Sequence, residues 1–268
     1  MTARVGGEIM RKCWFSFGPL LTISLVLLLC AQAITQTTEP RLFAKPERLT
    51  LNGFGEPDPN KEPTSTTFLT ASFYPIGWSR DGKFAYLVEP PDEACGCYFA
   101  EIVIQDLVTD KILWSERYSS ESLEKPEAEN LATFWPKKQK QYSAKLAKYG
   151  IRPISDSRLI FPVLEFEDDQ LTPKIDVRIK TDNDLEVIGN VTVKLESKRR
   201  GSKVISRESY RKGQISGFRN AEIAGLLKSP FEDRIAVLIV EEHRGWEGPP
   251  NITLIRVSGA ALKAGFTK

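Results

Sequence analysis

The sequence predicts a mainly β protein: an open two-part antiparallel β structure, propeller-blade-like or sandwich-like, with one bridging helix. Short runs rich in valine, isoleucine and aromatic residues recur along the chain, and polar turns containing glycine separate them. Only one segment carries the apolar spacing of an amphipathic helix. About nine to eleven strands can be counted in this way, whereas a closed propeller needs at least about four blades of four strands each. We therefore expect an open structure.

The N-terminal segment has the composition of a secretory signal peptide. Arg4, Arg11 and Lys12 precede an apolar run that ends at Leu29, and Ala31-Gln32-Ala33 gives the small-x-small pattern of a cleavage site. We expect residues 1–33 to be removed by cleavage after Ala33. The remaining chain is then exported, to the periplasm or the extracellular space.

Two other outcomes for this segment stay open. The stretch 13–33 is nearly long enough to span a bilayer as an uncleaved anchor, although Gly18 and Pro19 interrupt it. Cys30 follows three leucines and could be lipidated, although lipoprotein signals usually carry a small residue just before the cysteine. Membrane association is expected only if the N-terminal segment is retained or Cys30 is lipidated.

The charge of the exported chain disfavours nucleic acid as a partner. Residues 1–33 hold three basic residues and one acid, which leaves 34 of the 37 basic and 34 of the 35 acidic residues. A nucleic-acid-binding protein usually shows a basic excess, because phosphate neutralisation dominates its affinity. Only two cysteines remain after residue 33, so packing rather than a disulfide framework should stabilise the fold.

The exported part is expected to divide into a tether and a β domain. Residues 34–66 are rich in proline and threonine and poor in apolar residues, which is typical of a flexible tether. Residues 67–268 contain the recurring strand patterns and are long enough to bury a large core.

Eight strands of the β domain can be placed from β-branched or alternating runs between turns, namely 84–88, 100–107, 112–114, 158–167, 175–180, 191–196, 234–240 and 252–257. The first two should form a hairpin with the long loop Pro90–Cys97, and the last two a hairpin through Gly245 to Pro250. The run Arg234–Val240 is apolar without interruption, which indicates a central strand covered on both faces.

One helix is expected at residues 136–149. Pro136 is suited to the first helical position, and Gly150 to the position just after the end. Between them Tyr142, Leu146 and Tyr149 recur at the spacing of one narrow apolar face.

The turn and strand Ile76–Tyr86, with the sequence IGWSRDGKFAY, resembles the strand entry of propeller blades related to TolB and WD repeats. Those blades commonly carry a Trp/Phe-Ser-Pro-Asp-Gly turn, in which Arg80 here replaces the proline. Together with Ala100–Leu107 and Gly245–Pro249, this segment makes the chain similar to a family of bacterial predicted secreted proteins of unknown function. The resemblance covers roughly two stretches, residues 70–118 and 223–259. It implies export and a β architecture, and no activity of that family can be carried over.

Cys95-Gly96-Cys97 is the most unusual local feature of the chain. In an oxidising compartment the two cysteines can close a small disulfide, which either fixes the loop or takes part in thiol-disulfide exchange. No basic residue lies near them in sequence to lower a thiol pKa, whereas Asp92 and Glu93 would raise it. We prefer a local structural disulfide to a redox role.

The segment Glu241–Gly248 is a candidate ligand-binding loop, with His243, Arg244 and Trp246 as its candidate residues. Trp246 could be a stacking platform for a sugar or a peptide, or it could fold back and cap the sheet edge, which we prefer. His243 is the sole histidine, so a zinc site would combine it with Cys95 and Cys97 only if the two hairpin loops meet at one edge. We predict no metal and no cofactor.

Conventional catalytic sets are not apparent in the sequence. No nucleophile-elbow pattern accompanies His243. An acidic cluster at Glu165, Glu167, Asp168 and Asp169 could supply paired carboxylates, but acidic strand ends are common, and we interpret it as a turn.

Two hypotheses for the function follow. The first is a non-enzymatic exported β module that binds a protein or envelope component. The second is a thiol-disulfide or metal-dependent enzyme centred on the Cys95-Gly96-Cys97 loop. The sequence favours the first, because no catalytic set is apparent.

Overall fold

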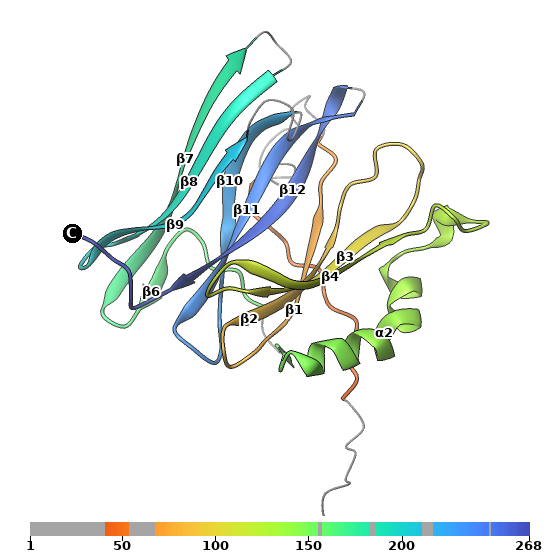
Figure 1. The fold of residues 1–268 in the computed structure, drawn as a ribbon, viewed down its shortest axis with the longest axis horizontal. Helices are drawn as coiled ribbons and strands as arrows, with labels where there is room; N and C mark the ends of the chain where they lie inside the picture. The colour runs from red at the N-terminus through yellow and green to blue at the C-terminus, as the bar shows by residue number, and fades with distance from the viewer. Residues whose placement is uncertain (1–40, 54–67, 155–156, 183–185, 211–216, 247) are drawn as a thin grey trace, which may run out of the picture. The chain divides into compact units, whose positions relative to one another are not determined.

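The computed structural model describes residues 41–53, 68–154, 157–182, 186–210, 217–246 and 248–268. The expected signal peptide and most of the expected tether lie outside these residues. Within them, strands form three antiparallel sheets accompanied by one α-helix (Figure 1). The predicted fold class, an open and mainly β antiparallel structure with one helix, is confirmed. No helix in this part of the chain has the length and apolarity needed to cross a membrane.

The first sheet has the strand order β4-β3-β2-β1-β5. Its strands are β1 (Ser72–Trp78), β2 (Lys83–Glu89), β3 (Phe99–Asp106), β4 (Lys111–Ser119) and β5 (Arg152–Pro153). A 3-10 turn, η2 (Pro126–Ala128), and the helix α2 (Leu131–Lys148) connect β4 to β5. Both ends of this connection therefore lead into strands of the first sheet.

The second and third sheets come from the rest of the chain. The second has the order β10-β11-β12 and consists of β10 (Phe218–Lys228), β11 (Arg234–Gly245) and β12 (Gly248–Ala261). The third has the order β6-β7-β8-β9 and consists of β6 (Leu164–Phe166), β7 (Asp169–Asp182), β8 (Glu186–Ser197) and β9 (Gly201–Tyr210).

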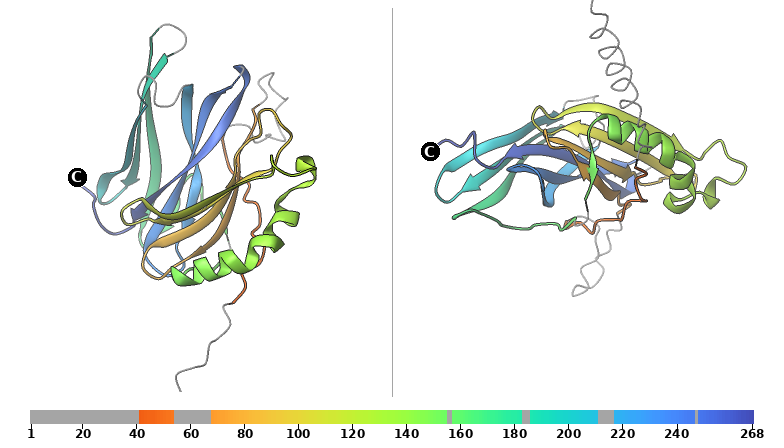
Figure 2. Two further views of the ribbon diagram at one scale, coloured as in Figure 1. Left: turned by 45° about the vertical axis from the view of Figure 1, so that its right-hand side comes forward. Right: turned by 90° about the horizontal axis from the view of Figure 1, so that it is seen from below.

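Three apolar cores separate the helix and the three sheets. One face of the first sheet packs against α2, which lies along its strands in both views of Figure 2. The other face packs against the second sheet, and the far face of the second sheet packs against the third. In β2, Ala85 and Leu87 point to the helix, whereas Phe84 and Tyr86 point to the second sheet. This alternation is the two-residue period of a strand.

The predicted central strand is confirmed. β11 lies between β10 and β12, and its residues 235–241 are all buried. Ile235, Val237 and Ile239 belong to the core shared with the third sheet, and Ala236, Leu238 and Val240 to the core shared with the first. Because both faces of this strand are covered, its sequence has no polar alternation.

The helix begins five residues before the expected start, and Pro136 lies inside it. Asn130 is the N-cap: its side chain accepts hydrogen bonds from the backbone N–H groups of Ala132 (2.9 Å) and Thr133 (3.2 Å). The Thr133 hydroxyl accepts one from the Asn130 N–H in return, which completes a capping box. Pro136 costs the helix one hydrogen bond, but Phe134 and Trp135 beside it are buried. The expected end at Gly150 is confirmed, since its φ is 71°.

Residues 41–53 fall within the expected tether, and this part of the chain packs against the domain. Phe43 is 4% exposed, and its backbone N–H donates to the Ser143 hydroxyl of α2 at 2.9 Å. The Leu49 N–H donates to the carbonyl of Phe73 in β1 at 2.8 Å. The rest of the expected tether, residues 34–40 and 54–66, lies outside the described residues.

Several strands differ from their expected extent. Within the predicted strand 158–167, only β6 is a strand, and Ile160 forms a single bridge to Leu226. The strands β1, β9 and β10 were not predicted. In β1 the residues Pro75 and Gly77 look like strand breakers, but they form a bulge in the pairing with β2. A side chain at position 77 would collide with the backbone of Arg152, so β5 can pair there only because residue 77 is glycine.

Candidate functional site

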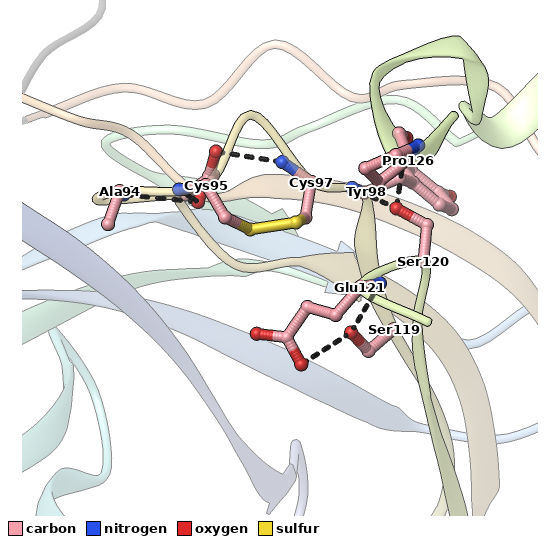
Figure 3. Close-up of a disulfide and its surroundings, with 9 residues drawn as sticks. Ala94, Cys95, Cys97, Tyr98, Ser119, Ser120, Glu121 and Pro126 are labelled. Atoms are coloured by element: carbon pink, nitrogen blue, oxygen red, sulfur yellow. Dashed lines mark hydrogen bonds between the residues drawn. A yellow bond between two sulfur atoms is a disulfide. The ribbon is translucent and has the colours of Figure 1, made fainter. Parts of the chain in front are cut away.

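The loop between β2 and β3 carries a disulfide between Cys95 and Cys97, whose Cα atoms lie 5.2 Å apart (Figure 3). The Asp92 carboxylate holds this loop by accepting hydrogen bonds from the backbone N–H groups of Ala94 (3.2 Å), Cys95 (3.2 Å) and Cys97 (3.0 Å). Cys95 is exposed and Cys97 half-buried. The loop therefore has the local disulfide that the sequence favours, and this disulfide is open to solvent.

Asp92 remains ionised in this loop. Burial acts to raise the pKa of its carboxyl group, but hydrogen bonds from the backbone N–H groups of residues 94–97 outweigh burial and lower that pKa below its usual value. The other end of the loop is tied to the end of β4: the Tyr98 N–H donates to the Ser120 hydroxyl at 2.8 Å, and the Ser120 N–H donates to the Tyr98 carbonyl at 3.0 Å. Hydrogen bonds thus hold the loop at both ends.

Trp246 lies at the tip of the β11–β12 hairpin, just after the last residue of β11. Its side chain is 89% exposed, the largest exposed fraction among the large apolar side chains of the described residues. The expectation that Trp246 folds back to cap the sheet edge is wrong, because the turn places the indole beyond the paired strands. The Trp246 backbone N–H donates to the Glu93 carboxylate at 2.5 Å, which ties the hairpin to the disulfide loop.

The disulfide loop and the Trp246 hairpin line a groove of about 670 Å³. We call it the Trp246 groove. Its apolar walls come from Leu69, Pro90, Pro91, Phe99, Trp246 and Pro250. Its charged residues are Asp92, Glu93 and Glu121, and among the described residues no lysine, arginine or histidine lines it. The groove is therefore aromatic, proline-rich and acidic.

Glu121 reaches the groove from the segment that follows β4 (Figure 3). Its carboxylate accepts a hydrogen bond from the Ser119 hydroxyl at 3.0 Å, and its backbone N–H donates to the same hydroxyl at 3.2 Å. Three segments distant in sequence thus supply the three carboxylates and the indole.

His243 does not belong to the groove. Its side chain is 2% exposed and lies edge-on to the rings of Phe218 (5.6 Å between centroids) and Tyr210 (6.2 Å). The candidate set of His243, Arg244 and Trp246 is therefore not one site: His243 is buried between sheets, while Trp246 projects into solvent. The two hairpin loops do meet at one edge, but the buried His243 cannot join Cys95 and Cys97 there. Among the described residues no group of three or more potential metal ligands is found.

Glu241 is the centre of a buried polar network beside His243. Its carboxylate accepts hydrogen bonds from the Tyr210 hydroxyl at 2.6 Å and from Arg256 Nε at 2.8 Å, and His243 Nε2 lies 3.5 Å away. Burial acts to raise the Glu241 pKa, but His243, Arg256 and Tyr210 together lower it below its usual value. Arg256 Nη1 also contacts Ser206 of β9 at 3.2 Å, so the network links the second and third sheets.

Each carboxylate of the acidic cluster at residues 165–169 contacts another side chain of the same chain. Glu165 accepts from the Gln170 side chain at 2.6 Å, Glu167 pairs with Lys263 at 2.9 Å, Asp168 pairs with Arg199, and Asp169 pairs with Arg200 at 3.0 Å. Because each carboxylate has a partner within the chain, the turn interpretation fits better than a catalytic pair.

A basic hollow lies where α2 ends. It is lined by Arg80, Lys83, Lys148 and Arg152, with Asp81 bound to Lys83. Positive side chains near a helix C-terminus stabilise the helix dipole, and this accounts for Lys148 and Arg152 without a ligand.

Comparison of the chain with protein-family models, with curated proteins and with solved structures finds no match. The resemblance to TolB- and WD-related blades therefore stays a prediction. Sequence reasoning found Cys95, Cys97 and Trp246 but missed Phe99, Glu121 and Pro250 as parts of the same groove. The sequence signal that could have indicated a shared groove is the prolines beside both hairpin loops. That the two loops meet is seen only in the folded chain.

Proposed function

We propose that this chain is an exported, non-enzymatic β module that binds a protein partner of the cell envelope, and that the partner docks in the Trp246 groove. The observation that carries the proposal is the Trp246 side chain, which is 89% exposed on the wall of a groove. An indole supplies a large contact area with few rotatable bonds, and tryptophan is enriched where protein partners bind most tightly.

The construction of the groove supports this proposal. The disulfide closes one loop, the Asp92 carboxylate fixes the same loop, and Glu93 joins it to the hairpin. The three prolines of its walls have little backbone freedom. Fewer groups must be ordered when a ligand enters such a groove, so more of the contact energy remains as affinity.

The test is photo-cross-linking in the native envelope. The photo-reactive amino acid benzoylphenylalanine is placed at position 246 of the full chain, and, as the control, at position 161 in a second variant. Phe161 is 49% exposed and does not line the groove. We expect a defined polypeptide adduct from position 246 and none from position 161. Adducts that are equal from both positions, or absent from position 246, would contradict the proposal.

One observation favours the alternative of thiol-disulfide exchange, namely that Cys95 is exposed and lines the groove. In that reaction an incoming thiolate attacks Cys95 Sγ, the bond to Cys97 breaks, and Cys97 leaves as a thiolate. We place this second, because no described residue of the groove offers a cationic side chain to stabilise a thiolate and Asp92 opposes one.

A variant with Cys97→Ser separates the two functions. In this variant Cys95 is a free thiol. If the chain takes part in exchange, its thiolate attacks a disulfide of the partner, one partner sulfur leaves as a thiolate, and a mixed disulfide stays on Cys95, which a non-reducing gel of the envelope fraction resolves. A binding module gives no such adduct, and its cross-link from position 246 persists in reductant.

A further inference from the structure

The described side chains that line the Trp246 groove offer hydrogen-bond acceptors and almost no donors. The carboxylates of Asp92, Glu93 and Glu121 only accept when ionised, and the indole N–H of Trp246 is the one strong donor among these side chains. A sugar presents hydroxyl groups that both donate and accept, so it would find few donors here. Guanidinium and ammonium groups donate and never accept. They are the chemical complement of this lining.

The groove carboxylates also differ from several other carboxylates at the surface of the chain. Three acids outside the groove are paired with arginines: Glu101 with Arg117, Asp176 with Arg178, and Asp168 with Arg199. Inside it, Glu93 and Glu121 contact a backbone N–H and a hydroxyl, and no cationic side chain of the described residues pairs with either. Within the described residues these two carboxylates have no cationic partner, and their chemistry suits a cation from outside.

The indole and the prolines of the groove further restrict the kind of cation that fits it. The face of an indole attracts cations, and the planar guanidinium of arginine stacks on it better than the compact ammonium of lysine. The proline and phenylalanine walls are apolar and suit the aliphatic stem of a long basic side chain. The open groove bounded by two loops suits an extended chain.

We propose that the groove binds a cationic, extended polypeptide segment, in which an arginine side chain lies on the face of Trp246 and donates to the carboxylates of Glu93 and Glu121. This inference rests on the proposed function, since it names the chemistry of the protein partner.

The experiment measures fluorescence anisotropy of labelled hexa-arginine titrated with the exported protein, residues 34–268 with the disulfide intact. Hexalysine, hexaglutamate and a chitin oligosaccharide are the comparison probes. We expect hexa-arginine to bind best, hexalysine more weakly, and the acidic and sugar probes not at all. The Trp246→Ala variant and the double variant Glu93→Gln/Glu121→Gln should each weaken hexa-arginine binding about tenfold or more.

Two control variants separate the groove from the charge of the whole surface. The double variant Asp176→Asn/Glu196→Gln removes the same charge from exposed positions of the third sheet, and Phe161→Ala removes an exposed ring elsewhere. Both should bind hexa-arginine as the parent does. Equal weakening in the charge control and in the groove variant would overturn the inference, because the attraction would then be general.

The remaining outcomes distinguish the inference from the function on which it rests. A polypeptide cross-link from position 246 without any preference for hexa-arginine would overturn the inference that the partner segment is cationic. The proposal that the chain is a protein-binding module would then still stand. Trp246-dependent binding of the chitin probe alone overturns both, in favour of a sugar ligand. The absence of any adduct from position 246 removes the proposed function and this inference with it.

Discussion

His243 and Trp246 lie three residues apart in sequence but in opposite surroundings. His243 is still within β11, where the alternation of the strand turns its ring toward Tyr210 and Phe218 between two sheets. Trp246 has left the strand, and its indole stands in solvent on the wall of a groove. Polar and aromatic residues in one short loop therefore need not form one site, because the last paired residue of a strand decides which of them face the core.

The two regions also differ in how their charges are satisfied. Glu241, beside His243, receives hydrogen bonds from Tyr210 and Arg256, so the protein itself supplies the partners of this buried carboxylate. Glu93 and Glu121 in the groove have no cationic partner in the described chain. The first region is thus built for stability, and we assign the second to binding.

The largest expected effect is on stability, from Glu241→Ala. This change leaves Arg256 without its buried counter-ion, and we expect it to lower the free energy of unfolding by about 3 kcal/mol. Urea unfolding followed by circular dichroism measures the loss. The neighbouring Glu242→Ala is the control, because Glu242 is only half-buried and should cost less than about 1 kcal/mol. Similar losses in both variants would show that the Glu241 network contributes no more to the free energy of unfolding than a half-buried glutamate does.

The stabilisation by Glu241 should also depend on pH. Its pKa is lower in the folded chain than its usual value of 4.5, so the unfolded chain takes up the proton first as the pH falls. The parent protein should therefore lose more stability than Glu241→Gln between pH 5 and pH 3, while the difference between the two should be constant from pH 5 to pH 7. A difference that stays the same down to pH 3 would mean that Glu241 does not titrate with folding.

Trp246→Ala should affect the groove and leave the fold unchanged. An exposed side chain contributes little to packing, so the free energy of unfolding should change by less than about 0.5 kcal/mol. Cross-linking cannot report on this variant, so binding is measured with labelled hexa-arginine, whose dissociation constant should rise about tenfold. A clear loss of stability would show that the indole packs against the domain after all.

Removing the disulfide with Cys95→Ser/Cys97→Ser should have only a modest effect on stability. The bridge closes a loop of only three residues, for which the chain-entropy argument gives at most about 1.5 kcal/mol. Thermal unfolding of the parent and of this variant measures the cost. A loss well above this value would mean that the disulfide loop supports the first sheet and not only the groove.

The parts of the fold that the sequence predicts are those with a strong local pattern. The apolar runs of β11, β2 and β3 are dictated by burial on both faces, so these strands could be placed closely. β9 is half-exposed at the edge of a sheet and carries little apolar alternation, so it gave no signal. The helix start was missed because Pro136 looked like a first residue, whereas the Asn130–Thr133 capping box is the actual start signal.

The candidate site was predictable only in part. Cys95 and Trp246 stand out by residue type, but the contact between Glu93 and the Trp246 backbone joins positions 153 residues apart. No local pattern encodes that contact, since it depends on how the first and second sheets pack. The grouping of His243 with Trp246 fails because two residues that are close in sequence at a strand end need not be close in space.

The most direct test of binding in the Trp246 groove is a solution NMR titration of residues 34–268 with hexa-arginine, observing the indole N–H signals. The Trp246 signal is assigned by its loss in Trp246→Ala, and the buried Trp78 and Trp135 serve as internal references. If hexa-arginine binds in the Trp246 groove, the Trp246 signal shifts with the titration while the two references stay in place. A Trp246 signal that does not move, or that moves no more than the references, would contradict binding in the Trp246 groove.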